Sequence, residues 1–158
     1  MKKKLPIIAS FVLATFIFTS IFFFIKANRP MARAKKEAVG LARKYSDLKE
    51  VDFFYWFNRK ESYFTVAGKD SSKNDIYVII PRSGEKVTIL DQDAGVDRDK
   101  VLKKVINEEN PDRITKINLG MVKDKPTWEV VGQSNDKRLE YYLVDFKTGE
   151  IEDSLRGI

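Results

Sequence analysis

The chain has 158 residues, 33% of them charged and 43% hydrophobic, which is typical of one folded domain or two very small ones. It contains no histidine and no cysteine, which excludes disulfides, thiol catalysis and most zinc sites. The net charge is +6, but the part of the chain from Ala27 onward contains 25 Lys and Arg residues and 23 Asp and Glu residues, so it is close to neutral. The body therefore carries no basic stripe, and nucleic-acid binding is excluded.

The first segment, residues 5–25, carries no charge and lies between Lys4 and Lys26. A helix needs about 20 apolar residues to cross a hydrocarbon core about 30 Å thick, so this segment is long enough. A cleaved signal peptide usually has a shorter apolar region followed by small residues, whereas this segment ends in Phe22, Phe23, Phe24 and Ile25. We therefore expect residues 5–25 to form an uncleaved transmembrane signal anchor.

Basic residues flank both ends of this anchor, so the positive-inside rule does not fix its orientation. A short tail before a first anchor is consistent with residues 1–4 being cytoplasmic and the bulk of the chain extracytoplasmic. The basic residues that follow the anchor can meet anionic lipid headgroups; they are Lys26, Arg29, Arg33, Lys35 and Lys36.

The body begins with a predicted helix over residues 31–47, in which Ala34, Ala38, Leu41, Ala42 and Tyr45 have helical spacing. Strands are expected at residues 51–57, 63–66, 76–80 and 86–90, the first two joined as a hairpin. A turn with the sequence SGE separates the last two.

The stretch DQDAGVDRD, residues 91–99, gathers four aspartates. An EF-hand loop needs glycine at its sixth position and glutamate at its twelfth, and this stretch has neither. It is either a linker whose Asp97 or Asp99 caps the next helix, or a weak calcium site. That helix has Val101, Leu102, Val105 and Ile106 on one face and ends before Pro111.

The second half repeats the first at an offset of 65 residues. IYVIIPRSGEKV lies over YYLVDFKTGEIE, YFTVAG over WEVVGQ, and the turn NRK over KDK. The offset predicts strands at residues 117–122, 128–131, 141–144 and 151–155. The pattern indicates two tandem α+β units, residues 31–92 and 96–158, each with one helix packed on an antiparallel sheet. Units this small bury little surface alone, so we expect them to dock on each other.

The anchor, the two units and the closing PTWEVVGQSNDKRLEYYLVDFKTGEI resemble the YpmB or TseB-like family of cell wall elongation regulators. The resemblance covers nearly the whole chain. It implies two PepSY-like, cystatin-like subdomains behind a membrane anchor, and an exported, non-catalytic protein that acts near the penicillin-binding transpeptidases. It supplies no catalytic residues.

The run VDFFYWFNRK, residues 51–60, holds five consecutive aromatic residues. The repeat places Asp52, Phe54 and Trp56 at positions equivalent to Ile117, Leu119 and Met121, the expected core face. A tight hairpin about Arg59 and Lys60 would pair Trp56 with Tyr63 and Phe54 with Thr65. The equivalent hairpin of the second unit would pair Met121 with Trp128 and Leu119 with Val130. This leaves a second apolar face on the first unit, made of Val51, Phe53, Tyr55, Phe57, Phe64 and Val66.

Aromatic side chains bury about 150–250 Å² each, so a face this size needs cover. The second unit, a partner protein, lipid headgroups or wall glycan could supply it. We predict a membrane-anchored adaptor that binds a wall-synthesis protein such as a penicillin-binding protein; the alternative is a module that binds wall glycan through the aromatic face. No cofactor, metal or catalytic residue is predicted. The nearest candidate for a catalytic Ser-Lys pair, in the stretch SSK at residues 71–73, falls in a polar loop.

Overall fold

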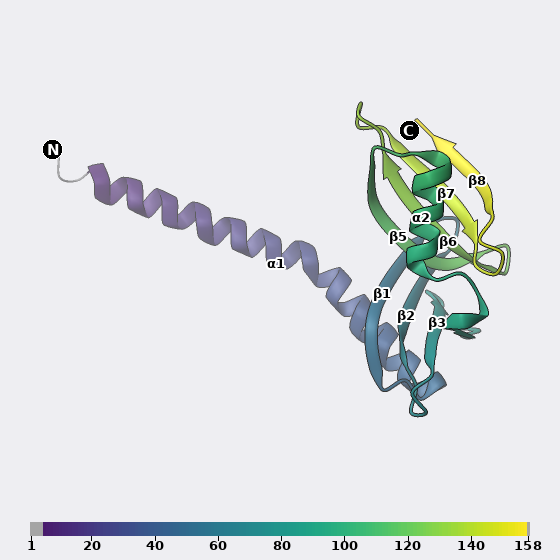
Figure 1. Cartoon of the computed structure of the whole chain (residues 1–158). Helices are drawn as coiled ribbons and strands as arrows, with labels where there is room; N and C mark the ends of the chain where they lie inside the picture. The colour runs from purple at the N-terminus through teal and green to yellow at the C-terminus, as the bar shows by residue number, and fades with distance from the viewer. Residues whose placement is uncertain (1–4, 158) are drawn as a thin grey trace. The chain divides into compact units, whose positions relative to one another are not determined.

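The computed structural model describes residues 5–157, so the expected cytoplasmic tail at residues 1–4 lies outside the described part. The chain divides into two units, Met1–Lys36 and Glu37–Ile158. The first consists of most of the helix α1 (Leu5–Ser46), and the second contains the end of α1 and all the strands (Figure 1).

Helix α1 runs without a break through the expected anchor and the expected helix at residues 31–47, with Pro30 inside it. Three hydroxyl side chains in its apolar part donate to the carbonyl oxygen four residues earlier: Thr15 to Phe11, Thr19 to Thr15 and Ser20 to Phe16. Such bonds satisfy polar groups that a membrane could not. Among the described residues, this is the one helix long and apolar enough to cross a membrane.

Two four-stranded antiparallel sheets follow, each with its strands in chain order. The first comprises β1 (Glu50–Asn58), β2 (Ser62–Lys69), β3 (Asp75–Pro81) and β4 (Thr88–Asp91). The second comprises β5 (Arg113–Val122), β6 (Lys125–Gln133), β7 (Leu139–Asp145) and β8 (Ile151–Arg156). All eight predicted strands are present, and the chain is an α+β protein with an N-terminal apolar helix.

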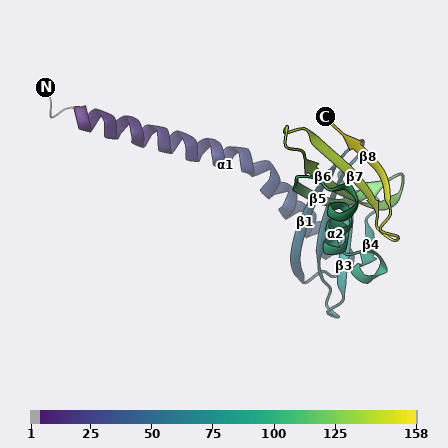
Figure 2. The same ribbon diagram turned by 45° about the horizontal axis from the view of Figure 1, so that its top comes forward.

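A short helix η1 (Gln92–Ala94) and the helix α2 (Arg98–Glu109) connect the sheets. Asp97, one of the two candidate caps in the sequence, caps α2 by accepting a hydrogen bond from the backbone N–H of Lys100. The helix ends at Asn110, whose left-handed backbone (φ 48°) closes it before Pro111. Figure 2, seen with Figure 1, shows α2 against the second sheet, where Val101 and Val105 join its core.

Two hydrophobic clusters hold this unit together. In the first, Ala38 and Ala42 of α1 pack on Val66, Val78 and Ile80 of the first sheet. The second cluster draws on both sheets and on α2, and its largest side chains are Trp128, Tyr142, Phe146, Tyr77 and Tyr55. Each face of the first sheet is therefore covered in part, one by the end of α1 and the other by the second sheet.

The predicted hairpin registers are wrong in both sheets. Trp56 pairs with Phe64 and Phe54 with Val66, because the first loop contains three residues, Arg59 to Glu61. In the second hairpin Leu119 pairs with Trp128 and Met121 with Pro126. There the loop is the two-residue turn Lys123-Asp124, with φ values of 49° and 62°, typical of a type I′ turn.

The difference in loop length has a large consequence in the first sheet. A register shift of one residue moves alternate side chains of β2 to the opposite face. Phe64 and Val66 therefore lie beside Phe54 on the face that packs on α1. A bulge between Val51 and Phe53 leaves Asp52 unpaired and exposed, and places Val51 on the α1 side as well.

Candidate functional site

The six residues predicted to form one apolar binding face lie in three environments. Val51, Phe64 and Val66 pack in the cluster beneath α1. Tyr55 and Phe57 are buried, and Tyr55 belongs to the cluster shared by the two sheets. Phe53 is 50% exposed. The binding role predicted for this set therefore stays a prediction, and Phe53 is its one strongly exposed member.

The second sheet covers the buried aromatic side chains of β1. The ring of Tyr55 meets Trp128 edge to face, with 5.6 Å between ring centroids. Trp128 also meets Tyr77 edge to face and donates from Nε1 to the backbone oxygen of Val96 at 2.9 Å. Phe57 lies against Gly120, where no side chain intervenes. Within Glu37–Ile158, the second half of the chain thus covers the part of the aromatic face that Tyr55 and Phe57 form.

Phe53 borders a small pocket at the junction of β1, β3 and the start of α2. The pocket has a volume of about 210 Å³ and is lined by Phe53, Tyr55, Tyr77, Gln92, Asp97, Arg98 and Asp99. Phe53 and Tyr55 stack side by side with 22° between their planes. The guanidinium of Arg98 lies 5.6 Å from the Phe53 ring centroid, within the range of a cation–π contact.

Burial controls the ionisation of the two tyrosines in this pocket. It raises the pKa of Tyr55 to about 12, and the pKa of Tyr77 also rises, because burial removes water that would stabilise the ionised phenols. The hydrogen bond from the backbone N–H of Lys100 lowers the pKa of Asp97 below its usual value. At neutral pH the pocket therefore presents neutral phenols, carboxylates and one guanidinium.

A buried polar cluster lies on the other face of the second sheet. Asn118 and Glu129 are 3% and 5% exposed, and the Asn118 amide donates to Glu129 Oε1 at 3.3 Å. Arg59 Nε lies 3.7 Å from Glu129 Oε2, an ion pair between the two hairpins. Neither Asn118 nor Glu129 was singled out from the sequence. The predicted register does not place them opposite each other, so the sequence carried no signal for their pairing; in the structure they are direct partners on β5 and β6.

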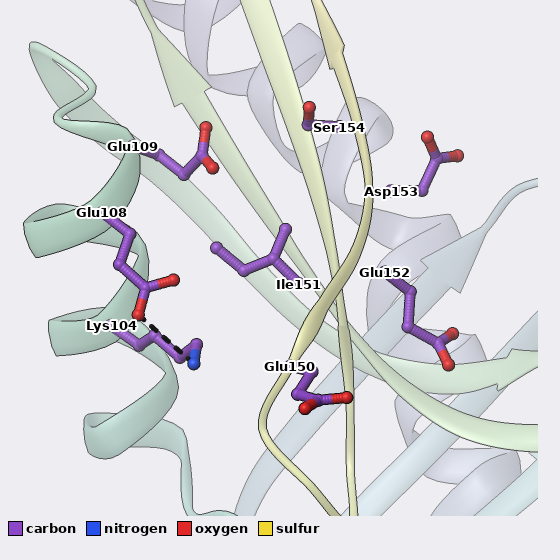
Figure 3. Close-up of a pocket in the computed structure, with 8 residues that line it drawn as sticks. All are labelled: Lys104, Glu108, Glu109, Glu150, Ile151, Glu152, Asp153 and Ser154. Carbon is purple, nitrogen blue, oxygen red and sulfur yellow. Dashed lines mark ion pairs between the residues drawn. The ribbon is translucent and has the colours of Figure 1, made fainter.

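An acidic groove runs between α2 and β8 (Figure 3). Its carboxylates come from Glu108 and Glu109 on the helix and from Glu150, Glu152 and Asp153 on and beside the strand. Lys104 pairs with Glu108 at 3.2 Å, and Arg156 pairs with Glu109. Figure 3 shows the carboxyl groups spread along the groove on either side of Ile151, so they do not converge on one point.

The remaining candidates for chemistry are engaged in structural contacts. Lys73, the lysine of SSK, pairs with Glu50 at 2.6 Å, and Ser72 lies in the turn that Asp70 organises. The calcium alternative for residues 91–99 gains no support, since among residues 5–157 no group of three or more acidic side chains is placed to hold a metal ion. Asp97 instead caps α2, as the linker interpretation predicted.

Comparisons with known proteins agree with this architecture. Residues 37–81 match the model of the "cell wall elongation regulator TseB-like domain", and residues 95–155 match that of the "peptidase propeptide and YPEB domain". A protein of Bacillus subtilis named "Probable cell wall elongation regulator TseB" is 30% identical, in an alignment that covers 96% of this chain and 96% of the relative. The chain belongs to the TseB family of cell wall elongation regulators.

A solved structure shows the same relationship. The YpmB protein of Bacillus subtilis superposes with a TM-score of 0.66 at 28% identity, over 77% of this chain and 95% of that one. The resemblance noted in the sequence is therefore confirmed, and a TseB-like α+β fold with two antiparallel sheets accounts for the body of the chain.

Proposed function

We propose that this protein regulates cell wall elongation as a non-catalytic adaptor held at the membrane. The observation that carries the proposal is the 30% identity, over 96% of both chains, to a relative named as a cell wall elongation regulator. The described residues add no competing chemistry, since the Lys73 amine is paired and the acidic groove does not converge.

The anchor gives the adaptor its location. The helix α1 is long and apolar enough to cross a bilayer, and we propose that its N-terminal end is cytoplasmic and that residues after the apolar stretch are extracytoplasmic. Confinement to the membrane plane raises the effective concentration of the adaptor toward partners in the same membrane. The proposed partner is accordingly a membrane-anchored wall-synthesis protein, such as a penicillin-binding protein.

We also propose that the body arose as two tandem PepSY-like, cystatin-like units, residues 31–92 and 96–158. The support is that each sheet has four strands in the same order, with a helix before each. The two family models match separate segments, residues 37–81 and 95–155, which correspond closely to the two proposed units. Burial of Tyr55 against Trp128 is the kind of contact that docks two small units.

The proposed contact position for a partner is Phe53, since the other five residues of the predicted face are covered or partly covered within the chain. A photo-crosslinking amino acid introduced at Phe53 in the full chain, in growing cells, should capture a wall-synthesis protein. Two other exposed apolar positions serve as matched controls, Ile89 on β4 and Leu155 on β8, which are 45% and 47% exposed.

Capture of a wall-synthesis protein from Phe53, and weaker capture from Ile89 and Leu155, would support both the adaptor function and the contact position. Capture only from a control position would keep the adaptor function and refute the contact position. If none of the three positions yields a wall-synthesis protein, the adaptor proposal fails.

A further inference from the structure

Two buried tyrosines, Tyr55 and Tyr77, line the pocket beside Phe53. Tyr55 and Tyr77 are 6% and 3% exposed, yet neither hydroxyl has a hydrogen-bond partner among the described residues. The contrast is clear in the same chain, where Tyr63 donates to Glu61 and Tyr142 to Glu140. Buried phenols normally find a partner because an unpaired buried polar group destabilises the fold.

Both hydroxyls keep contact with the space of the pocket. Arg59 Nη1 is the one fully enclosed side-chain nitrogen or oxygen without a partner in the described part of the chain, so the two phenolic oxygens are not sealed in the core. The charge of Arg98 affects the pKa of both tyrosines. The charge of Asp99 affects that of Tyr55, and the charge of Asp97 affects that of Tyr77. The phenolic ends therefore lie near the polar rim of the pocket, which these three charged residues form. The pocket is therefore a recess whose inner wall carries two free donor–acceptor groups.

The rim limits the charge of a suitable ligand. Although the pocket lies at the start of α2, Asp97 already accepts from the Lys100 N–H there and pairs with the Lys100 amine at 3.0 Å. Asp99 adds a second carboxylate, paired with Arg98 at 3.3 Å. An anion would meet these two carboxylates, and a simple cation would meet Arg98. The charges favour an uncharged ligand with many hydrogen-bonding groups.

The remaining features match such a ligand. The Gln92 side chain donates to the Ile76 oxygen, which leaves its own amide oxygen as an acceptor. Phe53 and Tyr55 present nearly parallel rings at the edge of the pocket. A volume of about 210 Å³ is below the range of about 300–1,000 Å³ usual for drug-sized ligands, so it suits one small ring.

We propose that this pocket binds one pyranose unit of a glycan, with sugar hydroxyls bonded to Tyr55, Tyr77 and the rim carboxylates. Each sugar hydroxyl can donate and accept, which fits a wall that alternates phenols, carboxylates, an amide and a guanidinium. The ring would lie against the Phe53 side of the pocket. The proposal goes beyond the adaptor function, since it concerns a small ligand and needs no protein partner.

The test uses the full chain in detergent micelles with N-acetylglucosamine and its soluble oligomers as probes, followed by titration calorimetry or NMR. Tyr55→Phe and Tyr77→Phe each remove only a hydroxyl and keep the ring. Each substitution should weaken binding about tenfold, the equivalent of one hydrogen bond. Tyr142→Phe is the matched control, since its hydroxyl is bonded to Glu140 and does not line the pocket; it should bind as the natural chain does.

The thermal midpoint without ligand separates binding from structure. Removal of an unpartnered buried hydroxyl should leave the midpoint unchanged or raise it, so a loss of binding in Tyr55→Phe or Tyr77→Phe cannot then be assigned to unfolding. Saturable binding that both substitutions weaken supports the proposal. The proposal is overturned if no pyranose probe binds, or if the variant that combines Tyr55→Phe and Tyr77→Phe binds as tightly as the natural chain. Tighter binding of a small amine such as methylammonium would also overturn it. Capture of a protein partner at Phe53 has no bearing on these outcomes.

Discussion

Gly120 lies directly against Phe57: a methyl group at Gly120 would come within 2.3 Å of Phe57 Cγ. This contact joins β5 to β1, and thus the second sheet to the first. Phe57 is fully buried there, at the end of the run of five aromatic residues. The close approach is possible because glycine has no Cβ.

Gly120→Ala should therefore weaken the contact between the sheets. Forcing a methyl group into a packed interface typically costs about 1–3 kcal/mol. Chemical or thermal unfolding of the full chain, followed by tryptophan fluorescence, should report a loss of that size. Gly40→Ala is the control, since nothing lies within 4 Å of a methyl group there and α1 should gain up to about 1 kcal/mol in helix propensity. Equal stability of the two variants would refute the packing role of Gly120.

The pair Asn118 and Glu129 leads to a second prediction. Asn118→Asp removes the amide that donates to Glu129 and places two carboxylates side by side in a buried site. We expect a loss of about 2–4 kcal/mol in unfolding free energy at neutral pH, recovered in part as the pH falls and one carboxyl is protonated. Asn107→Asp, on the exposed side of α2, should change stability by less than about 0.5 kcal/mol. If denaturant titration finds the two substitutions equivalent, Asn118 has no structural role.

The strands and α2 were predictable because their signals are local. Alternating apolar residues, the aspartate cap at Asp97 and Pro111 after α2 each act within a few residues. The core face of β5 was also correctly inferred, since Leu119 is buried in the shared cluster with Ile117 and Met121 against it.

The hairpin registers were not predictable in the same way. One residue more in the Arg59–Glu61 loop than in the Lys123-Asp124 turn shifts β2 relative to β1 and turns Phe64 and Val66 toward α1. The pocket beside Phe53 also could not be inferred, because it brings together β1, β3, η1 and α2. Local patterns carry no information on how those four elements meet.

Asp97 provides a prediction about acid. Its carboxylate accepts the Lys100 N–H in the folded chain, which lowers its pKa below the unfolded value. Its contribution to stability is therefore present above the unfolded pKa, near 4, and is lost as the pH falls through the folded pKa. Asp97→Ala should cost about 1 kcal/mol at neutral pH. Asp97→Asn should keep the cap and reduce the dependence on acid pH, measured as unfolding free energy from pH 7 to pH 2; an unchanged acid profile would contradict this role.

The anchor can be tested by placing charge in its centre. Phe16→Asp with Ile17→Asp should raise the free energy of membrane insertion by about 5–7 kcal/mol, since each aspartate at a helix centre costs about 2.5–3.5 kcal/mol. The variant should leave the membrane fraction of fractionated cells. Met31→Asp with Ala32→Asp changes exposed positions beyond the apolar stretch and should leave the chain in the membrane fraction. Membrane retention of both variants would show that α1 is not the anchor.

The two pocket tyrosines predict a specific alkaline behaviour. Burial raises the pKa of Tyr55 to about 12 and raises that of Tyr77, so both stay protonated in the folded chain where a free tyrosine, with a pKa near 10, ionises. Below about pH 10 neither group makes stability depend on pH; above it the unfolded chain ionises first, so the folded chain loses stability as the pH rises toward about 12, the pKa of Tyr55. In an absorbance titration of tyrosinate, Tyr55→Phe and Tyr77→Phe should each remove one group that ionises late, and should leave the earlier part of the curve unchanged. If either substitution instead removes absorbance from the earlier part of the curve, the replaced tyrosine ionises as a free tyrosine does. Water would then reach its hydroxyl freely, and the hydroxyl would not be buried in the pocket wall as described.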